Sequence, residues 1–394
     1  MNISQINNRK QMKPLKLSLS EMPHLTLEPS MMCNLNCRCC YNTDRRYSKS
    51  LRDVQQEVDF ALSKRNLESI SIVGGEPTLY PYLVELVSYI KSKNLICQFL
   101  TNGLLLASER GDALLDKLQQ AGIDRIILHV DHGQGRSEKE MNDLCNTLFA
   151  KLEKRKIYFS LSVTIYQENK TILAQWLTKY ASYKFFDGVL TTQARNSNGL
   201  DDAVHPSPDL SELYDHVQSE LAVEPASYIP SSIDDNEVCW LMFFYYINTN
   251  THQTFSISPL FNRFFRTIYR WFLGHHVFAI TMNPKYFACS FLITSLVEIF
   301  LKPWRIFSLI QLLKNSNWLH ALRFQYILMQ SGPQYNQVHK QFSLCYHCPD
   351  ATVRNGKITP VCLANHINPL GSKSQIEQEN QKLYTLVYEH MQEL

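Results

Sequence analysis

Short apolar runs of the kind that form strands alternate with longer amphipathic helical patterns from Leu25 to about Gln193. This alternation is typical of βαβ units, in which helices cover a parallel sheet. We predict strands at residues 25–29, 69–73, 96–101, 125–130, 158–165 and 188–192. The expected fold class is therefore α/β, as a partial (β/α)6 barrel of the TIM-like kind.

Residues with polar or reactive side chains follow the ends of these predicted strands. In parallel α/β sheets, ligands gather at the carboxyl ends of the strands. The residues that stand there, in chain order, are Cys33, Gly74, Thr101, Asn102, Asp131 and, shortly after the fifth strand, Asn169. We therefore expect a ligand-binding site along this edge of the sheet.

Three cysteines, Cys33, Cys37 and Cys40, follow the first predicted strand with the spacing Cys-x3-Cys-x2-Cys. The spacing is tight enough for one loop to bind three corners of an iron–sulfur cube. Three thiolates leave the fourth iron open for a small molecule, as an open position does in catalytic metal sites. The alternative is structural zinc, which needs four protein ligands, and the sequence offers no obvious fourth ligand nearby.

The segment Gly74-Gly75-Glu76-Pro77 follows the second predicted strand. Its two glycines permit positive φ angles and a close approach of the main chain to a ligand. Glu76 offers a carboxylate acceptor for a ligand ammonium group. Taken alone this segment is a common turn, but its place after a strand and downstream of the cysteines favours a binding loop.

The cysteine triplet, the apolar run Leu25-Thr-Leu27 before it and the Gly-Gly-Glu-Pro segment together resemble the radical S-adenosylmethionine (SAM) superfamily, over residues 25–195. The resemblance implies a catalytic [4Fe-4S] cluster whose open iron is chelated by SAM. In that superfamily one electron cleaves SAM to a 5′-deoxyadenosyl radical, which abstracts hydrogen from a substrate. It also implies a small electron donor such as flavodoxin or ferredoxin, and a site that excludes water and oxygen.

The resemblance assigns further residues to SAM. Residues 74–76 would hold its amino group. Thr101 and Asn102 would hold its ribose or its carboxylate, although a strand-terminating Asn-Gly turn explains both residues as well.

Two weaker candidates and one departure complete the predicted cofactor site. Asp131 and Asn169 are candidates for binding SAM, with helix capping as the alternative for both. The superfamily usually has an aromatic residue just before the third cysteine ligand, where this chain has Cys39. We expect Tyr41 to take the place of that aromatic residue.

A second cysteine set, Cys345, Cys348 and Cys362, has the spacing Cys-x2-Cys-x13-Cys. It resembles the auxiliary-cluster segment of radical SAM enzymes with twitch or SPASM extensions, which implies a second [4Fe-4S] cluster. The residues between the cysteines predict a β-hairpin that turns at Asn355-Gly356 and returns Cys362 towards Cys348. The alternative is a zinc site completed by a histidine, either His347 or His366.

Residues 239–344 differ in composition from the rest of the chain. Their charged residues are nine cations and one acid, namely Arg263, Arg266, Arg270, Lys285, Lys302, Arg305, Lys314, Arg323, Lys340 and Glu298. We predict helices at 260–273 and 287–301, the first with its arginines opposite its aromatic residues. This pattern suits the surface of an anionic membrane, with core helices of a capping domain as the alternative. The second helix is too short for a full membrane span, and nucleic-acid binding is disfavoured by the many leucine, isoleucine and phenylalanine residues.

The expected organisation is an N-terminal tail (1–24), a radical SAM core (25–195), a connector (196–238), a hydrophobic, basic helical region (239–344) and an auxiliary-cluster segment with a terminal helix (345–394). Tightly spaced cysteines and the lack of a signal peptide favour the cytoplasm, with docking to the inner face of the membrane as an option. The dense aromatic residues favour a hydrophobic or lipid-like substrate. A peptide substrate and a non-catalytic zinc-binding module are the alternatives.

Overall fold

The computed structural model describes residues 1–7, 9–42, 45, 47–194, 207–279, 286–314, 318–336 and 341–367. The chain divides into two compact units. The first, here called the parallel unit, comprises Leu17–Thr164 together with the segment that begins at His347. The second, here called the mixed unit, comprises Met1–Lys16, Ile165–Ala194 and Pro206–Tyr346.

Five strands in the order β1-β2-β3-β4-β5 form the sheet of the parallel unit, and each pairs in parallel with its neighbour. They are β1 (His24–Ser30), β2 (Ser69–Gly74), β3 (Ile96–Thr101), β4 (Arg125–His129) and β5 (Tyr158–Ile165). Most of their side chains are buried, as expected for a parallel sheet that is covered by helices.

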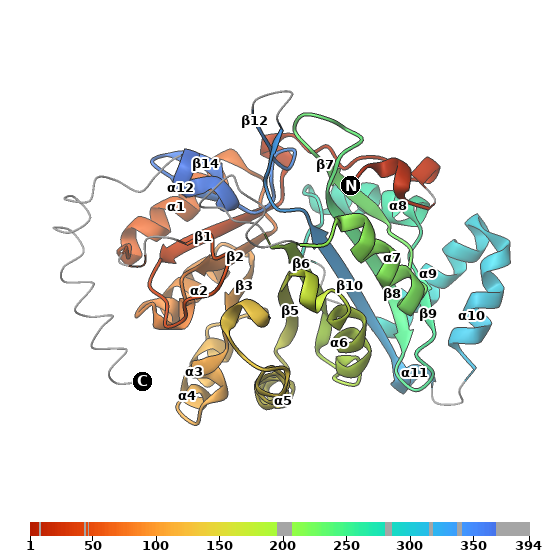
Figure 1. Ribbon diagram of the computed structural model, residues 1–394, viewed down its shortest axis with the longest axis horizontal. Helices are drawn as coiled ribbons and strands as arrows, with labels where there is room; N and C mark the ends of the chain where they lie inside the picture. Colours follow the sequence, from red (N-terminus) through yellow and green to blue (C-terminus); the bar gives the residue numbers. More distant parts are fainter. Residues whose placement is uncertain are drawn as a thin grey trace. The chain divides into compact units, whose positions relative to one another are not determined.

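Helices connect these strands and lie along the outer side of the sheet (Figure 1). They are α1 (Leu51–Lys64), α2 (Leu83–Ser92), α3 (Leu104–Ala107), α4 (Gly111–Gln120) and α5 (Glu138–Arg155), with the 3-10 turns η3 (Leu19–Glu21), η4 (Pro77–Leu79) and η5 (His132–Gln134). Serine side chains cap the first turns of α1 and α5, at Ser50 and Ser137. The sequence therefore sets where these two helices begin.

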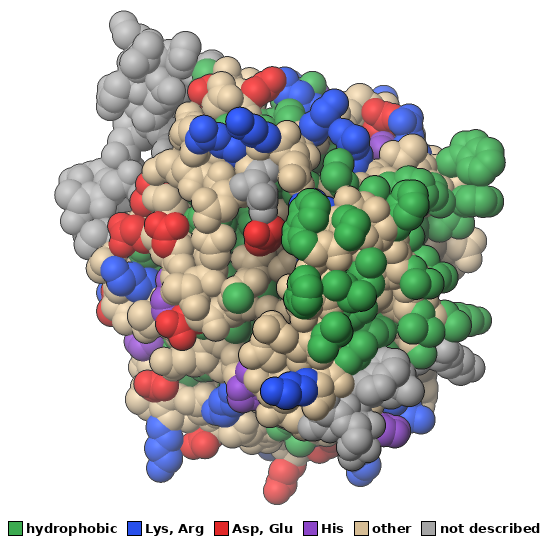
Figure 2. All heavy atoms as spheres, turned by 90° about the vertical axis from the view of Figure 1, so that its right-hand side faces the viewer, with side chains coloured by type: hydrophobic (Ala, Val, Ile, Leu, Met, Phe, Trp, Pro, Cys, Tyr) green, Lys and Arg blue, Asp and Glu red, His purple; other side chains and the backbone are tan. Residues whose placement is uncertain are grey.

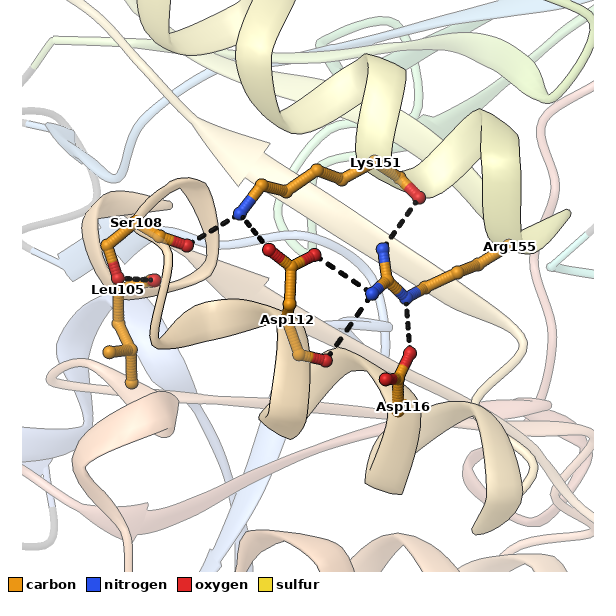
Figure 3. A network of polar contacts seen from close by, with 6 residues as sticks. All are labelled: Leu105, Ser108, Asp112, Asp116, Lys151 and Arg155. Carbon is orange, nitrogen blue, oxygen red and sulfur yellow. Dashed lines mark hydrogen bonds and ion pairs between the residues drawn. The ribbon is translucent and has the colours of Figure 1, made fainter.

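Ion pairs join α4 to α5 on the outer side of the parallel unit (Figure 3). The Lys151 ammonium lies 2.9 Å from a carboxylate oxygen of Asp112 and donates to the carbonyl of Ser108 at 2.5 Å. The Arg155 guanidinium pairs with both Asp112 and Asp116. Because the carboxylates are exposed, this network fixes the orientation of the helices more than it adds stability.

The mixed unit contains both parallel and antiparallel strand pairs. Its strands are β6 (Phe186–Gln193), β7 (Ser227–Pro230), β8 (Val238–Asn248), β9 (Thr254–Ser256) and β10 (Leu322–Gln330). Strand β10 pairs in parallel with β6 and antiparallel with β8, which also pairs antiparallel with β7 and β9. A separate ribbon is formed by β11 (Gln334–Asn336) and β12 (Gln341–Ser343).

The helices of the mixed unit are α6 (Ile172–Tyr180), α7 (Leu210–Leu221), α8 (Pro259–Leu273), α9 (Phe287–Leu301), α10 (Ile306–Leu312) and α11 (Trp318–Ala321), with the 3-10 turns η1 (Ile3–Gln5), η2 (Arg9–Gln11), η6 (Gln167–Asn169) and η8 (Pro303–Arg305). Every side chain of β8 is buried. Tyr246 of β8 packs edge-on against Phe291 of α9, with 4.9 Å between the ring centroids. The core of this unit therefore lies between β8 and the helices α8 and α9.

The predicted α/β class and the open, partial barrel are confirmed, because the strands are mostly parallel and their order is open. All six predicted strands are present, with ends that differ by at most two residues. The helices predicted at 260–273 and 287–301 correspond to α8 and α9. Within the described residues, no helix has the length and apolar character needed to cross a bilayer.

Three expectations about organisation were wrong. Residues 239–344 are not only helical, because they begin and end in the long strands β8 and β10. The predicted connector contains α7 and β7. The predicted N-terminal tail is not solvated, since Ile6 and Met12 are buried and Leu15 donates its N–H to the carbonyl of Tyr228. The predicted terminal helix at residues 375–394 lies outside the described residues.

Candidate active site

The three cysteines of the first set lie on residues 31–42, here called the cysteine loop, which follows β1. Main-chain and side-chain hydrogen bonds hold the loop at both ends. Asn42 donates to the carbonyl of Met31 at 2.7 Å, and the N–H of Arg38 donates to the carbonyl of Gly133 at 2.8 Å. Cys39 has a φ of 58°, in the left-handed region. The loop is therefore a fixed turn, anchored beyond the carboxyl ends of β1 and β4.

The thiols of Cys33, Cys37 and Cys40 are half-buried and free. Burial raises the pKa of Cys33, and it raises the pKa of Cys37 to about 12, with the charges of Cys40, Asp131 and Cys33 adding to the effect. Each of these interactions requires that the groups lie near one another. A metal centre would reverse the direction, because coordination by a cation deprotonates a thiol.

The donor set of the cysteine loop fits the metal centre that the cysteine spacing predicts. It consists of three half-buried thiols on one anchored turn. Cysteine thiolates are the ligands of iron–sulfur clusters. In the part of the chain that the structure describes, no three histidine, cysteine or acidic side chains, those of the cysteine loop included, are arranged so that they could hold a metal ion.

The glycines after β2 pack against the cysteine loop. A Cβ atom on Gly75 would overlap the carbonyl of Met32, and one on Gly74, whose φ is +115°, would overlap the carbonyl of Ser30. The N–H groups of Gly75 and Glu76 donate to these same carbonyls, those of Ser30 at 2.8 Å and Met32 at 2.7 Å. Glycine is thus required at residues 74 and 75, because the main chain there contacts the carbonyls of Ser30 and Met32. This contact fixes where the cysteine loop begins.

The Glu76 carboxylate lies buried at the ends of β2 and β3 and accepts four hydrogen bonds. Thr78 donates through its N–H and its hydroxyl, at 3.1 and 2.6 Å. The hydroxyl of Thr101 and the N–H of Asn102 donate at 2.6 and 2.7 Å. Burial raises the pKa of Glu76, and the four bonds oppose that rise. Glu76 therefore ties β2 to β3, and its predicted contact with SAM stays a prediction.

Asn102 links β3 to the cysteine loop. Its amide donates to the side chain of Asn34 at 2.7 Å, while its oxygen accepts from the N–H of Leu104 at 3.1 Å. The second bond is the turn that the alternative interpretation predicts. The hydrogen bond to Asn34 places Asn102 at the edge of the sheet that carries the thiols. Thr101 lies at the same edge, because Thr101 and Asn102 both donate to Glu76.

A pair formed by a half-buried histidine and a buried carboxylate lies at the end of β4, and sequence reasoning identified only the carboxylate. The carboxylate of Asp131 accepts from His129 at 3.0 Å and from the N–H of Thr164 at 3.2 Å, through the same oxygen. Burial lowers the pKa of His129, but the Asp131 charge and hydrogen bond outweigh it and leave that pKa raised. Burial raises the pKa of Asp131, and His129 and Thr164 outweigh it in the opposite direction. The sequence feature that could have identified His129 is its position at the end of a strand, two residues before Asp131.

Several buried polar atoms at this edge have no hydrogen-bond partner among the described residues. They include Oδ1 of Asp131, Nδ1 of His132 and Nη2 of Arg136. Arg136 is held by bonds from its other terminal nitrogen to Gln134 and, at 3.5 Å, to the carbonyl of Asn102. The Asp131 charge affects the pKa of Cys37, and Cys37 in turn affects the pKa of Arg136. An unpaired acceptor and an unpaired donor thus lie near the cysteine loop.

Other predicted site residues have local roles or lie elsewhere. Tyr41 donates its hydroxyl to the carbonyl of Gly74 at 3.3 Å, and burial raises its pKa. Asn169 belongs to the mixed unit, where its side-chain oxygen accepts from the N–H of Tyr166 at 2.7 Å. That bond is the capping role that its alternative interpretation predicts.

The predicted hairpin in the second cysteine set is confirmed. Strands β13 (Ala351–Arg354) and β14 (Lys357–Pro360) pair antiparallel across Asn355 and Gly356, whose φ angles are 49° and 68°. Two positive φ angles define a type I′ turn. Cys348 and Cys362 flank this hairpin in the parallel unit, whereas Cys345 belongs to the mixed unit. The grouping of all three around one metal centre stays a prediction.

Side chains of β13 and of the following turn connect the hairpin to β1 and the cysteine loop. The guanidinium of Arg354 donates to Glu28 of β1 at 2.9 and 2.8 Å, and to Asn365 at 2.6 Å. Asn365 donates to the carbonyl of Tyr41 at 3.1 Å. Arg65 donates to the carbonyl of Cys348 at 3.1 Å, and burial lowers its pKa to about 10. The hairpin is therefore part of the same packed unit as the cysteine loop.

A separate apolar pocket lies in the mixed unit. Aromatic side chains of β8, α8 and β10 form most of its wall, and its polar groups come from α8 and α9. The lining residues are Phe244, Tyr246, Ile257, Phe261, Asn262, Phe265, Ser290, Thr294 and Phe324. The pocket has the mixture of apolar wall and few polar groups that is typical of small-molecule sites.

Comparisons with known proteins agree with this description of the cysteine loop. Residues 27–158 match the family model of the radical SAM superfamily. The chain is 32% identical over 119 residues to the probable GTP 3′,8-cyclase of Methanococcus aeolicus, covering 28% of this chain and 38% of that protein. It is 23% identical over 203 residues to the S-adenosylmethionine-dependent nucleotide dehydratase of Flammeovirga pacifica, covering 46% of this chain and 67% of that protein.

Among solved structures, Streptococcus suis SuiB bound to the precursor peptide SuiA matches 51% of this chain and 47% of its own, at 18% identity and a TM-score of 0.43. The matched segments span 34% and 38% of two of the curated cyclases. Over residues 27–158, about a third of the chain, the protein therefore matches the radical SAM superfamily, within an α/β fold.

Proposed function

We propose that this chain is a radical SAM enzyme that binds a [4Fe-4S] cluster on Cys33, Cys37 and Cys40. The observation that carries the proposal is the cysteine loop, whose three half-buried thiols are held by main-chain bonds at the carboxyl edge of the parallel strands. When bound there with SAM, the cluster supplies one-electron cleavage of SAM and hence hydrogen abstraction from a substrate. The chain must hold, orient and shield these groups.

Residues at the same edge are suited to bind the polar part of SAM. Among the residues that the structure describes, one buried carboxylate oxygen of Asp131 accepts no hydrogen bond and one buried N–H group of Arg136 donates none. Leaving such groups unpaired costs about 1–3 kcal/mol each. A ligand with both an ammonium and a carboxylate group would pair them. We propose that Asp131 and Arg136 hold the amino-acid end of SAM beside the cysteine loop, with Glu76 keeping β2 and β3 in place.

For the substrate we propose a hydrophobic or lipid-like molecule. The supporting observation is the aromatic pocket of the mixed unit, whose few polar groups include Asn262 and Thr294. A peptide and a nucleotide, the latter suggested by the names of the relatives, serve as competing substrates in the test. Loss of product but not of SAM cleavage in Phe261→Ala, with Leu104→Ala as control, supports this role of the pocket.

Anaerobic reconstitution tests the proposed chemistry. The chain is loaded with iron and sulfide, its iron and zinc are counted, and 5′-deoxyadenosine is measured after addition of SAM and a reductant such as reduced flavodoxin. We expect cluster-bound iron and SAM cleavage, both lost in Cys40→Ala and kept in Cys289→Ala, which removes an exposed cysteine of the mixed unit. Bound zinc without iron, with SAM intact, would establish a non-catalytic zinc-binding module instead.

The second cysteine set is proposed to hold an auxiliary [4Fe-4S] cluster. Arg65 donates to the main-chain carbonyl of Cys348 at 3.1 Å, which fixes the chain at this cysteine. We expect Cys362→Ala to lower the iron content by about one cluster, to keep SAM cleavage and to lose product. Unchanged iron content in this variant would contradict the second cluster.

A further inference from the structure

Three neighbouring helical segments of the mixed unit turn apolar side chains towards solvent. These segments are α8, α9 and the stretch from η8 to α10, and their exposed apolar side chains are here called the apolar face. Its members are Phe264, Phe265, Ile268, Trp271, Phe272, Leu273, Tyr286, Leu292, Ile293, Leu296, Phe300, Leu301, Trp304, Ile306, Phe307 and Ile310. Figure 2 shows hydrophobic side chains gathered over much of one side of the molecule. Soluble monomers rarely expose so large a continuous apolar surface.

The same helices bury their polar groups. The sequence predicted that the arginines of α8 share one exposed face, but Arg266 is buried and donates to the carbonyl of Val277 at 3.1 Å. Glu298 of α9 is fully buried, accepts from the N–H of Ser258 at 2.6 Å and pairs with Arg305. Some polar side chains of these helices thus face inwards, while many apolar ones face outwards. Such an inversion is stable where the surroundings of the helices are themselves apolar.

The charges beside the apolar face are of one sign. Arg263, Arg270 and Lys314 are exposed on or next to these helices. Glu298 is the single acid between residues 239 and 344, and it is buried in its pair with Arg305. Residues 239–344 therefore contribute exposed cations and no exposed carboxylate on or beside these helices. This arrangement complements an anionic surface, whereas two copies of the chain face to face would set cation against cation.

The protrusion of side chains from the apolar face also favours a lipid bilayer as the partner. Its largest side chains stand well clear of their neighbours, with Trp271 80% exposed and Phe300 85% exposed. Protruding aromatic and aliphatic side chains beside cations enter the boundary between lipid headgroups and acyl chains. We propose that α8, α9 and α10 lie on the surface of an anionic phospholipid bilayer, with the apolar face inserted and the cations at the headgroups. This docking is independent of the proposed radical chemistry.

Vesicle flotation of the full chain tests the docking. We expect the protein to float with vesicles of phosphatidylcholine mixed with phosphatidylglycerol, and to bind more weakly when phosphatidylglycerol is omitted or salt is raised. Arg263→Gln and Arg270→Gln should each weaken binding about fivefold. Trp271→Ser with Phe272→Ser should weaken it more than tenfold, because two apolar side chains no longer insert. Leu19→Ser with Leu104→Ser, two exposed leucines of the parallel unit, should leave binding unchanged.

Other results would overturn the proposal. The proposal is overturned if the folded, iron-loaded protein does not float with anionic vesicles. Equal binding of the wild type and the Trp271→Ser, Phe272→Ser variant, or binding that ignores lipid charge, would also overturn it. A dimer that this variant converts to monomer, with no vesicle binding, would assign the apolar face to a second copy. Assay of 5′-deoxyadenosine in the same samples separates failure of docking from failure of the radical chemistry.

Discussion

Replacing Arg354 by methionine should lower the free energy of unfolding of the parallel unit by about 3–5 kcal/mol, because it leaves a buried carboxylate without its counter-charge. Arg354 and Glu28 both have 0% side-chain exposure. Two guanidinium nitrogens donate to the same oxygen of Glu28, at 2.9 and 2.8 Å, and the other oxygen has no partner among the described residues. The carboxylate of Glu28 would therefore keep none of its present hydrogen bonds.

Thermal unfolding followed by circular dichroism measures this loss. At roughly 2–4 °C per kcal/mol for a unit of this size, the Arg354→Met variant should unfold about 6–20 °C below the wild type. Glu28→Met combined with Arg354→Met should recover most of the loss, because it replaces the buried charges with apolar side chains. Lys93→Met, which breaks an exposed pair with Asp59, is the control and should have no measurable effect. A shift in Arg354→Met no larger than that of the control would refute the reasoning.

Further predictions concern the loop, the ion pair and a helix cap. Gly75→Ala should abolish iron binding or soluble expression, whereas Gly135→Ala, where the Cβ meets nothing and only the positive φ of 73° is strained, should keep both; equal behaviour would contradict the packing argument. The raised pKa of His129 means that its stabilisation is complete below its unfolded pKa of about 6.5 and is lost as pH rises through the folded value. The lowered pKa of Asp131 means that its own contribution is lost as pH falls through its folded value. His129→Gln should therefore flatten the loss of stability on the alkaline side in denaturant titrations at several pH values, and an unchanged profile would argue against the pair. Ser137→Ala should destabilise the chain by about 1 kcal/mol through loss of the α5 cap, measured by denaturant titration, and no loss would mean that the cap is redundant.

The strands and the edge that carries the candidate site could be predicted from sequence, because a parallel strand is a short apolar run with a polar residue at its end. Strand β8 was not predicted, because its sequence does not have this pattern. Its eleven residues are all buried and largely aromatic, so they show no period that separates a strand from a helix. The pairing of β8 with β10 joins distant segments, which local patterns do not report.

The roles of individual site residues were harder to predict than their positions. Glu76 stands where sequence placed it, but its four donors come partly from β3, so its role in joining strands depends on tertiary contacts. Gly75 was expected to permit a close approach to a ligand, which stays a prediction; in the structure the group that lies against it is Met32 of the chain itself. On α8, helical periodicity did not predict that Arg266 is buried while Arg263 and Arg270 are exposed, because the burial of Arg266 depends on the neighbouring Val277 and Met242.

The contact between Glu28 and Arg354 has a consequence for biosynthesis. The two residues are separated by 326 positions, so the first strand emerges from the ribosome long before its counter-ion has been translated. Until Arg354 has been translated, burial of the Glu28 carboxylate in β1 costs free energy. This cost disfavours tight packing of the sheet. Tight packing of β1 would then wait for synthesis of the segment that carries Arg354.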